Sequence, residues 1–225
     1  TATGAVAGFA TAQHQAMRRL QHLLDSVARQ EPKLHWMIGD RDDGSTVLVT
    51  DLAGGWIPPH VQIPVGVALL APERRSGPLA TMLGPTTLTA SHSPGQYIPP
   101  ADDHEPVPMS IGARRTADVE DLGWELSRAT KWRDGLPRLA HTLAKAASSG
   151  SGYLESEIEL LREHLQATTK RVLGEYPDKV DAATVGNWQL LASIDSLTRN
   201  ERICANYHLA WFQALSLPLK GEARR

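Results

Sequence analysis

Apolar residues recur at two different spacings along the chain, and the spacing changes near its middle. In the first part, Met17, Leu20, Leu24 and Val27 lie three or four positions apart. This spacing places them on one face of a helix, which predicts an amphipathic helix packed against a core. We expect the helix to end before Pro32, because the residue before a proline avoids helical backbone angles.

The segment after this helix alternates with a period of two. Leu34, Trp36 and Ile38 are separated by His35 and Met37, which is typical of a strand with one buried face. A second, β-branched strand is predicted over 46–52. The pair at 43–44, Asp-Gly, readily adopts the positive φ angles of a tight turn, so the two strands are predicted to form a β-hairpin.

Proline interrupts the next apolar run. Val61, Ile63, Val65, Val67 and Leu69 alternate, but Pro64 cannot donate a hydrogen bond to a neighbouring strand, which predicts a broken, bulged or edge strand. For the remainder of this part we expect a short helix within 72–82, a weak strand over 86–90, a long loop over 91–108 and a last short strand over 107–111.

Helical spacing returns after residue 116. Thr116 is predicted to cap a helix whose buried face holds Val119, Leu122, Leu126 and Ala129. A second helix is expected from 136 onward and a third from 154 to about 175. Residues 178–215 contain no proline and are predicted as one long helix or two, with Pro218 ending the last apolar stripe.

Composition supports the same division. Twelve of the 15 prolines lie between Pro32 and Pro108. We therefore expect an α+β fold in which an N-terminal helix and a small, mostly antiparallel, Pro-punctuated β-sheet (1–115) precede an antiparallel α-helical part (116–225). A Ser/Gly run over 148–152 is predicted to be a flexible joint, and the two parts could still pack as one unit.

Charge and cysteine content exclude several classes of protein. The 225 residues carry a formal net charge of −2, which argues against nucleic acid as a main partner. Cys204 is the one cysteine, so neither an internal disulfide framework nor a cysteine-based zinc site can form. No apolar run of 18 residues is present, and we expect no membrane span.

Acidic and histidine clusters in this sequence do not match known site spacings. Asp40, Asp42 and Asp51 fall at positions 1, 3 and 12 of a possible calcium loop, but the glycine of that loop is displaced. A second cluster lies in one predicted loop without regular spacing: His92, Asp102, Asp103, His104 and Glu105. We therefore predict no metal site, no cofactor and no catalytic residue.

The most unusual segment is Gly-Trp-Ile-Pro-Pro-His. Trp56, Pro58, Pro59 and His60 could cover an apolar edge of the sheet, with the prolines making the turn rigid. Alternatively, an exposed Trp56 beside rigid prolines would form a recognition surface at low entropic cost. Both interpretations remain open from the sequence. The candidate binding surface consists of Trp36, Trp56, Pro58, Pro59, His60 and Trp124.

This segment also carries a family resemblance. The runs Asp-Gly-Ser-Thr-Val (43–47), Thr-Asp-Leu-Ala-Gly-Gly-Trp-Ile-Pro-Pro (50–59) and Val-Gln-Ile-Pro (61–64) resemble the C-terminal region of mycobacterial proteins associated with type VII (ESX) secretion, in particular EspK-like proteins. Trp124-Glu-Leu and Trp132 extend the resemblance. It implies a protein-binding module, with a secretion substrate as the partner, preceded in the full protein by a long low-complexity region.

We therefore expect a non-enzymatic protein-interaction module of an adaptor or chaperone-like kind. The alternative is a small-ligand-binding protein or enzyme whose pocket lies between the two parts, lined by Trp36, Trp56, His60, the 91–108 loop and Trp124. A homo-oligomeric building block is a third hypothesis, and the oligomeric state is left open. The chain begins at Thr1 without Met, so we expect a missing native start, with a cytoplasmic, secreted or cell-envelope location.

Overall fold

The computed structural model describes residues 2–102, 105–150 and 152–216. The chain divides into two compact units, and each is described by itself. Unit 1 comprises Thr1–Leu70 and Arg75–Ala113, and unit 2 comprises Ala71–Arg74 and Arg114–Arg225. The division lies close to the break in composition, but the short segment Ala71–Arg74 belongs with the helices, which the sequence did not indicate.

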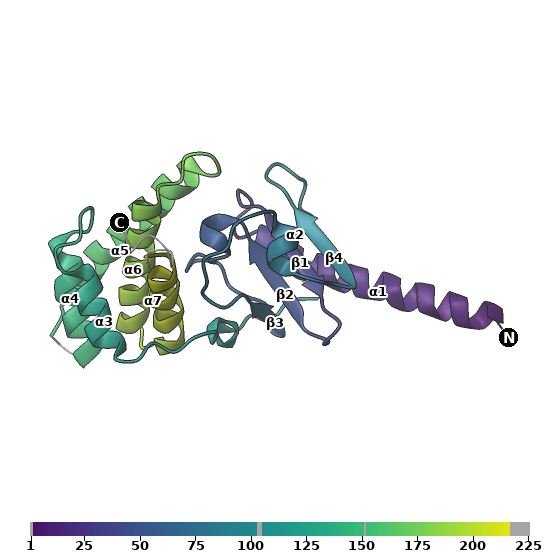
Figure 1. The fold of residues 1–225 in the computed structure, drawn as a ribbon, viewed down its shortest axis with the longest axis horizontal. Coiled ribbons are helices and arrows are strands. Elements are labelled where there is room, and N and C mark those ends of the chain that lie inside the picture. Colours follow the sequence, from purple (N-terminus) through teal and green to yellow (C-terminus); the bar gives the residue numbers. More distant parts are fainter. Residues whose placement is uncertain (1, 103–104, 151, 217–225) are drawn as a thin grey trace, which may run out of the picture. The chain divides into compact units, whose positions relative to one another are not determined.

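Unit 1 begins with α1 (Ala2–Ala28). Leu20, Leu24 and Val27 are fully buried, as their spacing predicts, whereas Met17 is partly exposed. Only the C-terminal half of α1 lies beside the strands, and the N-terminal half extends away from the sheet (Figure 1). Accordingly, all side chains over 8–15 are exposed.

A four-stranded sheet forms the rest of the unit 1 core, in the order β3-β2-β1-β4. The strands are β1 (Trp36–Asp40), β2 (Thr46–Thr50), β3 (Val67–Leu69) and β4 (Leu88–His92). β1 is antiparallel to both β2 and β4, while β3 pairs with β2 in parallel. The predicted β-hairpin is confirmed, and Gly44 adopts a φ of 83° in its turn. With two antiparallel pairs and one parallel pair, the sheet is mixed.

The expected interruption at Pro64 is also confirmed. Its segment does not join the sheet until Val67, and β3 is an edge strand. Pro64 forms an isolated bridge to Met109. The last short strand predicted over 107–111 is wrong beyond this bridge, because Ile111–Arg114 is a 3-10 helix. The short helix expected within 72–82 is α2 (Leu79–Leu83).

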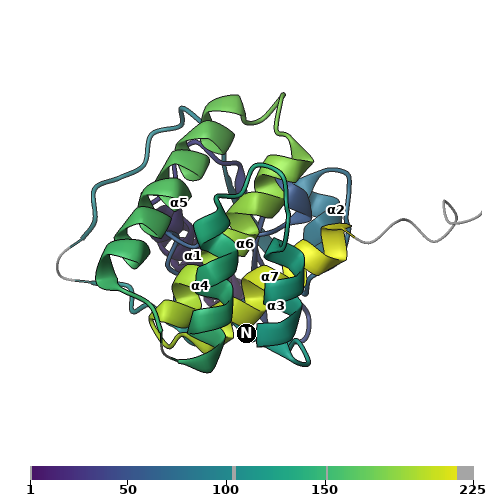
Figure 2. The same ribbon diagram turned by 90° about the vertical axis from the view of Figure 1, so that its left-hand side faces the viewer.

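Unit 2 is helical throughout its described core (Figure 2). Its helices are α3 (Leu122–Thr130), α4 (Arg138–Ser149), α5 (Glu155–Glu175), α6 (Ala182–Thr198) and α7 (Arg202–Ser216). Their shared core is apolar and closely packed, and it includes Leu122, Leu126, Leu143, Leu161, Leu190, Ile194 and Leu209.

Two boundaries in unit 2 differ from the predictions. Thr116 does not cap α3, which begins six residues later, after Asp121. A single helix over 178–215 is wrong: α6 and α7 are separate, and Asn200 between them has a φ of 60°. Asparagine tolerates this left-handed conformation, so a reversal is possible without glycine or proline. Ser151 of the predicted joint and Pro218 lie outside the described residues.

Candidate functional site

The Trp-Pro segment of unit 1 is packed inward. Trp56, Ile57 and Pro58 are buried, and Trp56 is 0% exposed. Gly54 and Gly55, which precede it, have φ angles of 71° and 115°. These left-handed conformations suit glycine, and they end the short 3-10 helix Leu52–Gly54 that follows β2. Of the two interpretations left open by the sequence, the exposed Trp56 is therefore wrong: its indole belongs to the core.

Trp36 is also fully buried, at the start of β1. Its indole N–H donates to the backbone carbonyl of Glu31 over 2.9 Å. The carboxylate of Glu31 lies 3.0 Å from Nε2 of His60. Since His60 is exposed and Pro59 is half-buried, this end of the segment reaches the surface while both indoles do not.

Trp124 is the sixth residue of the predicted surface, and it lies in unit 2. It is 63% exposed on α3, and the Arg128 guanidinium lies 5.1 Å from its ring centroid. Arg128 also pairs with Glu125 at 2.7 Å. The predicted surface residues are thus divided between the two units, with Trp124 apart from the other five in sequence.

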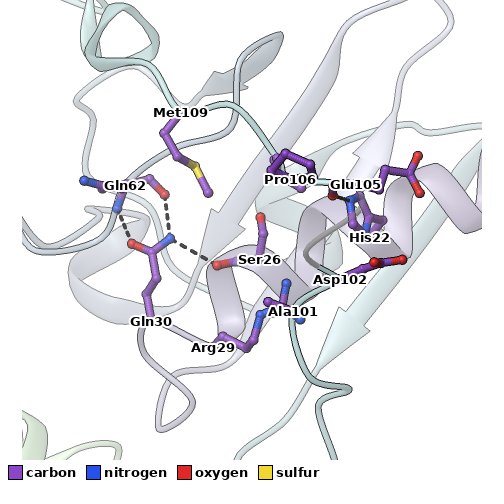
Figure 3. Close-up of a pocket in the computed structure, with 11 residues that line it drawn as sticks. His22, Ser26, Arg29, Gln30, Gln62, Ala101, Asp102, Glu105, Pro106 and Met109 are labelled. Atoms are coloured by element: carbon purple, nitrogen blue, oxygen red, sulfur yellow. Dashed lines mark hydrogen bonds between the residues drawn. The ribbon is translucent and has the colours of Figure 1, made fainter.

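Unit 1 carries a cavity of about 450 Å³ between α1 and the loop that follows β4 (Figure 3). Nε2 of His22 lies 3.1 Å from the carbonyl oxygen of Glu105, and Arg29 donates to the carbonyl of Pro99. These contacts bring part of the long 91–108 loop to α1. The other lining residues are Ser26, Gln30, Gln62, Ala101, Asp102, Pro106, Val107 and Met109.

The Gln30 side chain fixes one wall of this cavity. Its amide forms two hydrogen bonds with the backbone of Gln62, as a neighbouring strand would. The Gln30 amide accepts from the Gln62 N–H over 2.7 Å and donates to its carbonyl over 3.0 Å (Figure 3). The Ser26 hydroxyl donates to the Leu23 carbonyl within α1. Because that hydroxyl donates to its own helix, the cavity offers polar binding groups rather than a serine already paired with a base.

A second cavity, of about 490 Å³, lies in unit 2 at the connection between α3 and α4. We call it the α3–α4 pocket. Trp132 on its wall is 82% exposed and has a φ of 55°, which is uncommon for a bulky side chain. The pocket is lined by residues 130–138 together with His141 and Thr142.

The backbone that carries Trp132 is held by the next residue. Nε of Arg133 donates to Oδ1 of Asn187 over 2.6 Å, and its guanidinium stacks over the Phe212 ring at 4.8 Å. Desolvation lowers the pKa of Arg133. The Asn187 amide in turn donates to the Asp134 carbonyl over 3.1 Å. α6 and α7 therefore fix the loop from inside.

Gly135 completes this loop at a φ of 80°. A Cβ atom there would lie 2.6 Å from Nδ2 of Asn187, so only glycine allows the close approach. At the other side of the pocket, the Thr130 hydroxyl lies 3.1 Å from Nδ1 of His141, which orients the imidazole.

Comparison with known proteins places this arrangement in a family. Residues 14–94 match the family of unknown function DUF5632, and residues 119–215 match the family of unknown function DUF5631. A solved structure of a fragment of conserved hypothetical protein Rv3899c from Mycobacterium tuberculosis is 41% identical, covers 94% of this chain and 99% of that fragment, and superposes with a TM-score of 0.88. The chain belongs to the family of this fragment.

The DUF5632 match lies within unit 1 except for residues 71–74, and the DUF5631 match lies within unit 2. A further relative, the uncharacterized protein Rv2082 of Mycobacterium tuberculosis, is 41% identical over 209 residues. These residues make up 91% of this chain but 29% of Rv2082. This chain therefore spans less than a third of the length of that relative.

The acidic clusters do not form metal sites in the described part of this DUF5632–DUF5631 chain. No group of three or more potential ligands gathers there, and Asp103 and His104 lie outside it. Asp40 instead accepts hydrogen bonds from Arg19 and from the Thr46 hydroxyl. Among the described helices, none is long and apolar enough to cross a membrane.

Sequence reasoning missed most of the α3–α4 pocket. It named Trp132 only through the family resemblance and did not consider Lys131, Arg138 or His141 as neighbours. A signal was present, because a tryptophan between Lys131 and Arg133, just before Asp-Gly, is unusual for a loop with no apolar neighbours. In this family member, the pocket and Trp124 form the strongest candidate site.

Proposed function

We propose that this chain is a non-catalytic protein-interaction module, of an adaptor or chaperone-like kind, that acts in mycobacterial type VII secretion. The observation that carries the proposal is the exposure of two tryptophans in unit 2, Trp124 at 63% and Trp132 at 82%. An indole left in water forgoes the large stabilisation of burial, which a binding partner can supply.

The surroundings of these indoles suit a docking surface. Tryptophan and arginine are the residue types most enriched at the energetic centres of protein interfaces. Trp124 lies beneath Arg128, and Trp132 is held outward by the Arg133–Asn187 contact. Because the Trp124 indole and the backbone that carries Trp132 are held before a partner arrives, less order has to be gained on binding.

The secretion assignment rests on the sequence motifs around Trp56 and Trp124 and on the mycobacterial relatives. The buried position of Trp56 assigns its motif a structural role, namely the turn after β2. The motif around Trp56 would then stabilise the fold of the family. The exposed tryptophans of unit 2 would contact the partner, which we propose to be a secretion substrate.

Crosslinking in living cells tests this proposal. A photoreactive phenylalanine derivative replaces Trp124, Trp132 or, as a control, Leu154, which is also exposed. We expect one defined secretion-system protein to be crosslinked from positions 124 and 132 and not from 154. In the unlabelled protein, Trp124→Ala with Trp132→Ala should lower its co-purification about tenfold or more, because contacts at interface centres each contribute above about 1 kcal/mol.

The crosslinking outcomes separate two claims. Labelling that is equally diffuse from all three positions would contradict an interaction surface in unit 2. If a defined partner is crosslinked but is unrelated to secretion, the interaction module would stand and the proposed role in secretion would be refuted.

A second candidate function is small-ligand binding by unit 1, which the 450 Å³ cavity favours. His22, Arg29 and Asp102 supply groups that could recognise a polar molecule. A screen of polar metabolites by thermal shift, repeated with Gln30→Ala, would identify a ligand of this cavity. The pocket expected between the two parts stays a prediction.

A further inference from the structure

We infer that the α3–α4 pocket binds an acidic peptide segment of the partner, with carboxylates on its basic side chains and an apolar side chain against Trp132. This inference rests on the proposed function, since it names the chemistry that a partner would present to unit 2.

Charge at the pocket is strongly unbalanced. Three basic side chains, Lys131, Arg133 and Arg138, line it, against one acidic side chain, Asp134. Within the described residues, neither Lys131 nor Arg138 forms an ion pair, although both are exposed. Other arginines of unit 2 have carboxylate partners: Arg128 with Glu125, Arg162 and Arg199 with Asp195, and Arg171 with Glu175. The pocket therefore retains a net positive charge, whereas these four arginines are each paired with a carboxylate.

Aromatic and basic groups meet at this one place. The Trp132 indole offers an apolar face directly beside Lys131, and the pocket volume of about 490 Å³ accommodates two or three side chains. Carboxylates form charge-assisted hydrogen bonds with lysine and bidentate pairs with arginine. A peptide with glutamate or aspartate on either side of an apolar residue would satisfy both features.

The local extent of the positive charge favours a short acidic segment over an extended polyanion. The whole chain carries a net charge of −2. α5 of the same unit begins with Glu155, Glu157 and Glu159, so a nucleic acid spanning unit 2 would meet repulsion. A peptide segment needs only the few positive groups that the pocket supplies.

The groups that would contact the peptide are separate from those that hold the loop. Arg133, Asn187 and Gly135 keep the backbone in place through α6 and α7. Lys131, Trp132 and Arg138 are exposed and make no comparable side-chain contact among the described residues. Their substitution should therefore change binding without unfolding unit 2, which circular dichroism would verify.

Titration of two synthetic probe peptides onto the whole chain tests the inference. One peptide carries a phenylalanine flanked by two glutamates on each side, and its twin carries glutamine in place of every glutamate. We expect calorimetry to show affinity for the glutamate peptide at least about tenfold higher, since several charge-assisted contacts would be lost in the twin.

Variants with matched charge locate the binding. Lys131→Gln with Arg138→Gln should weaken the glutamate peptide about tenfold, and Trp132→Ala should weaken both peptides. The control, Lys145→Gln with Lys170→Gln, removes the same charge from exposed positions outside the pocket and should change affinity less than about twofold. A DNA duplex of equal charge should bind more weakly than the glutamate peptide.

Any of three results would overturn the inference. The two peptides could bind with equal affinity, the pocket variant and the control variant could lose equal affinity for the glutamate peptide, or DNA could bind more strongly than that peptide. The proposed function is tested apart from it by the cell crosslink. If Trp132→Ala removes the crosslinked partner while Lys131→Gln with Arg138→Gln does not, the interaction surface stands and the acidic segment is refuted. If no partner is lost in either variant, the proposed function fails as well.

Discussion

The two units use tryptophan differently. Unit 1 buries both of its tryptophans, Trp36 and Trp56, whereas unit 2 buries Trp188 and Trp211 but exposes Trp124 and Trp132. Trp36 lies in the central antiparallel strand of the sheet, with its indole N–H satisfied by the Glu31 carbonyl. Trp132 lies on a connection and has an inward-facing neighbour, Arg133. Buried tryptophans thus stabilise both units, and the two exposed tryptophans of unit 2 remain available for binding.

This contrast shows that local position, rather than residue type, decides what a tryptophan does. Trp124 is two residues after Leu122 and two before Leu126, both of which are buried. At 3.6 residues per turn, a position between them points away from their shared face. The helical stripe therefore already excluded Trp124 from the core.

The largest expected effect tests the structural role of Trp36. Trp36→Ala should lower the free energy of unfolding by about 3–5 kcal/mol, because it empties a large buried site and removes a partner from a buried carbonyl. Trp124→Ala, the matched control, should change it by about 0.5 kcal/mol or less. Urea denaturation measures both, and similar values for the two variants would contradict the contrast.

Two glycines sharpen the comparison of packing. A Cβ at Gly39 in β1 would lie 2.8 Å from Cγ2 of Thr86 and 3.0 Å from the Leu88 carbonyl oxygen. We expect Gly39→Ala to destabilise the protein by about 1–3 kcal/mol through overpacking. At Gly174 in α5, nothing lies within 4 Å of the added atom, so Gly174→Ala should stabilise the protein by about 0.5–1 kcal/mol. Thermal unfolding of the two variants should shift in opposite directions.

A buried histidine gives unit 2 a pH dependence. Burial, together with the nearby positive charge of Arg114, lowers the pKa of His208 well below its usual value of 6.5. The unfolded chain then binds a proton that the folded chain does not. The free energy of unfolding should therefore fall by about 1.4 kcal/mol per pH unit below pH 6.5, and this contribution is absent above that pH.

The measurement compares His208→Gln with the unmodified chain by urea denaturation between pH 7.5 and about pH 5. Other groups also titrate in this range. The informative quantity is therefore the difference between the two proteins in the slope of unfolding free energy against pH. An unchanged slope in His208→Gln would show that His208 is not buried in its neutral form.

The fold was largely predictable from local patterns, and the failures have physical causes. The hairpin at Asp43-Gly44 and the stripe of α1 depend on neighbouring residues alone, so both were predicted. The position of the break at Asn200 was not predicted because the left-handed conformation of asparagine leaves little trace in the sequence. The parallel pairing of β3 was missed because it depends on contacts distant in the chain.

The candidate site was less predictable. Of the proposed surface residues, Trp36 and Trp56 are core residues, since period-2 alternation and a glycine turn direct them inward. Trp132 and Lys131 come together with Arg138 and His141 only because α3 and α4 pack against each other. Sequence spacing specifies a helix face, but it does not specify which loop residues two helices bring to one pocket.

The pairing of β1 has a consequence for the order of events during synthesis. Trp36 lies opposite Thr50 on one side and His92 on the other, so one edge of the central strand stays open until more than fifty further residues have been translated. The helices of unit 2 are joined by short connections and can close quickly once made. A nascent chain would thus pass through a stage in which an unpaired central strand must be kept from other strands, whereas unit 2 has no such stage.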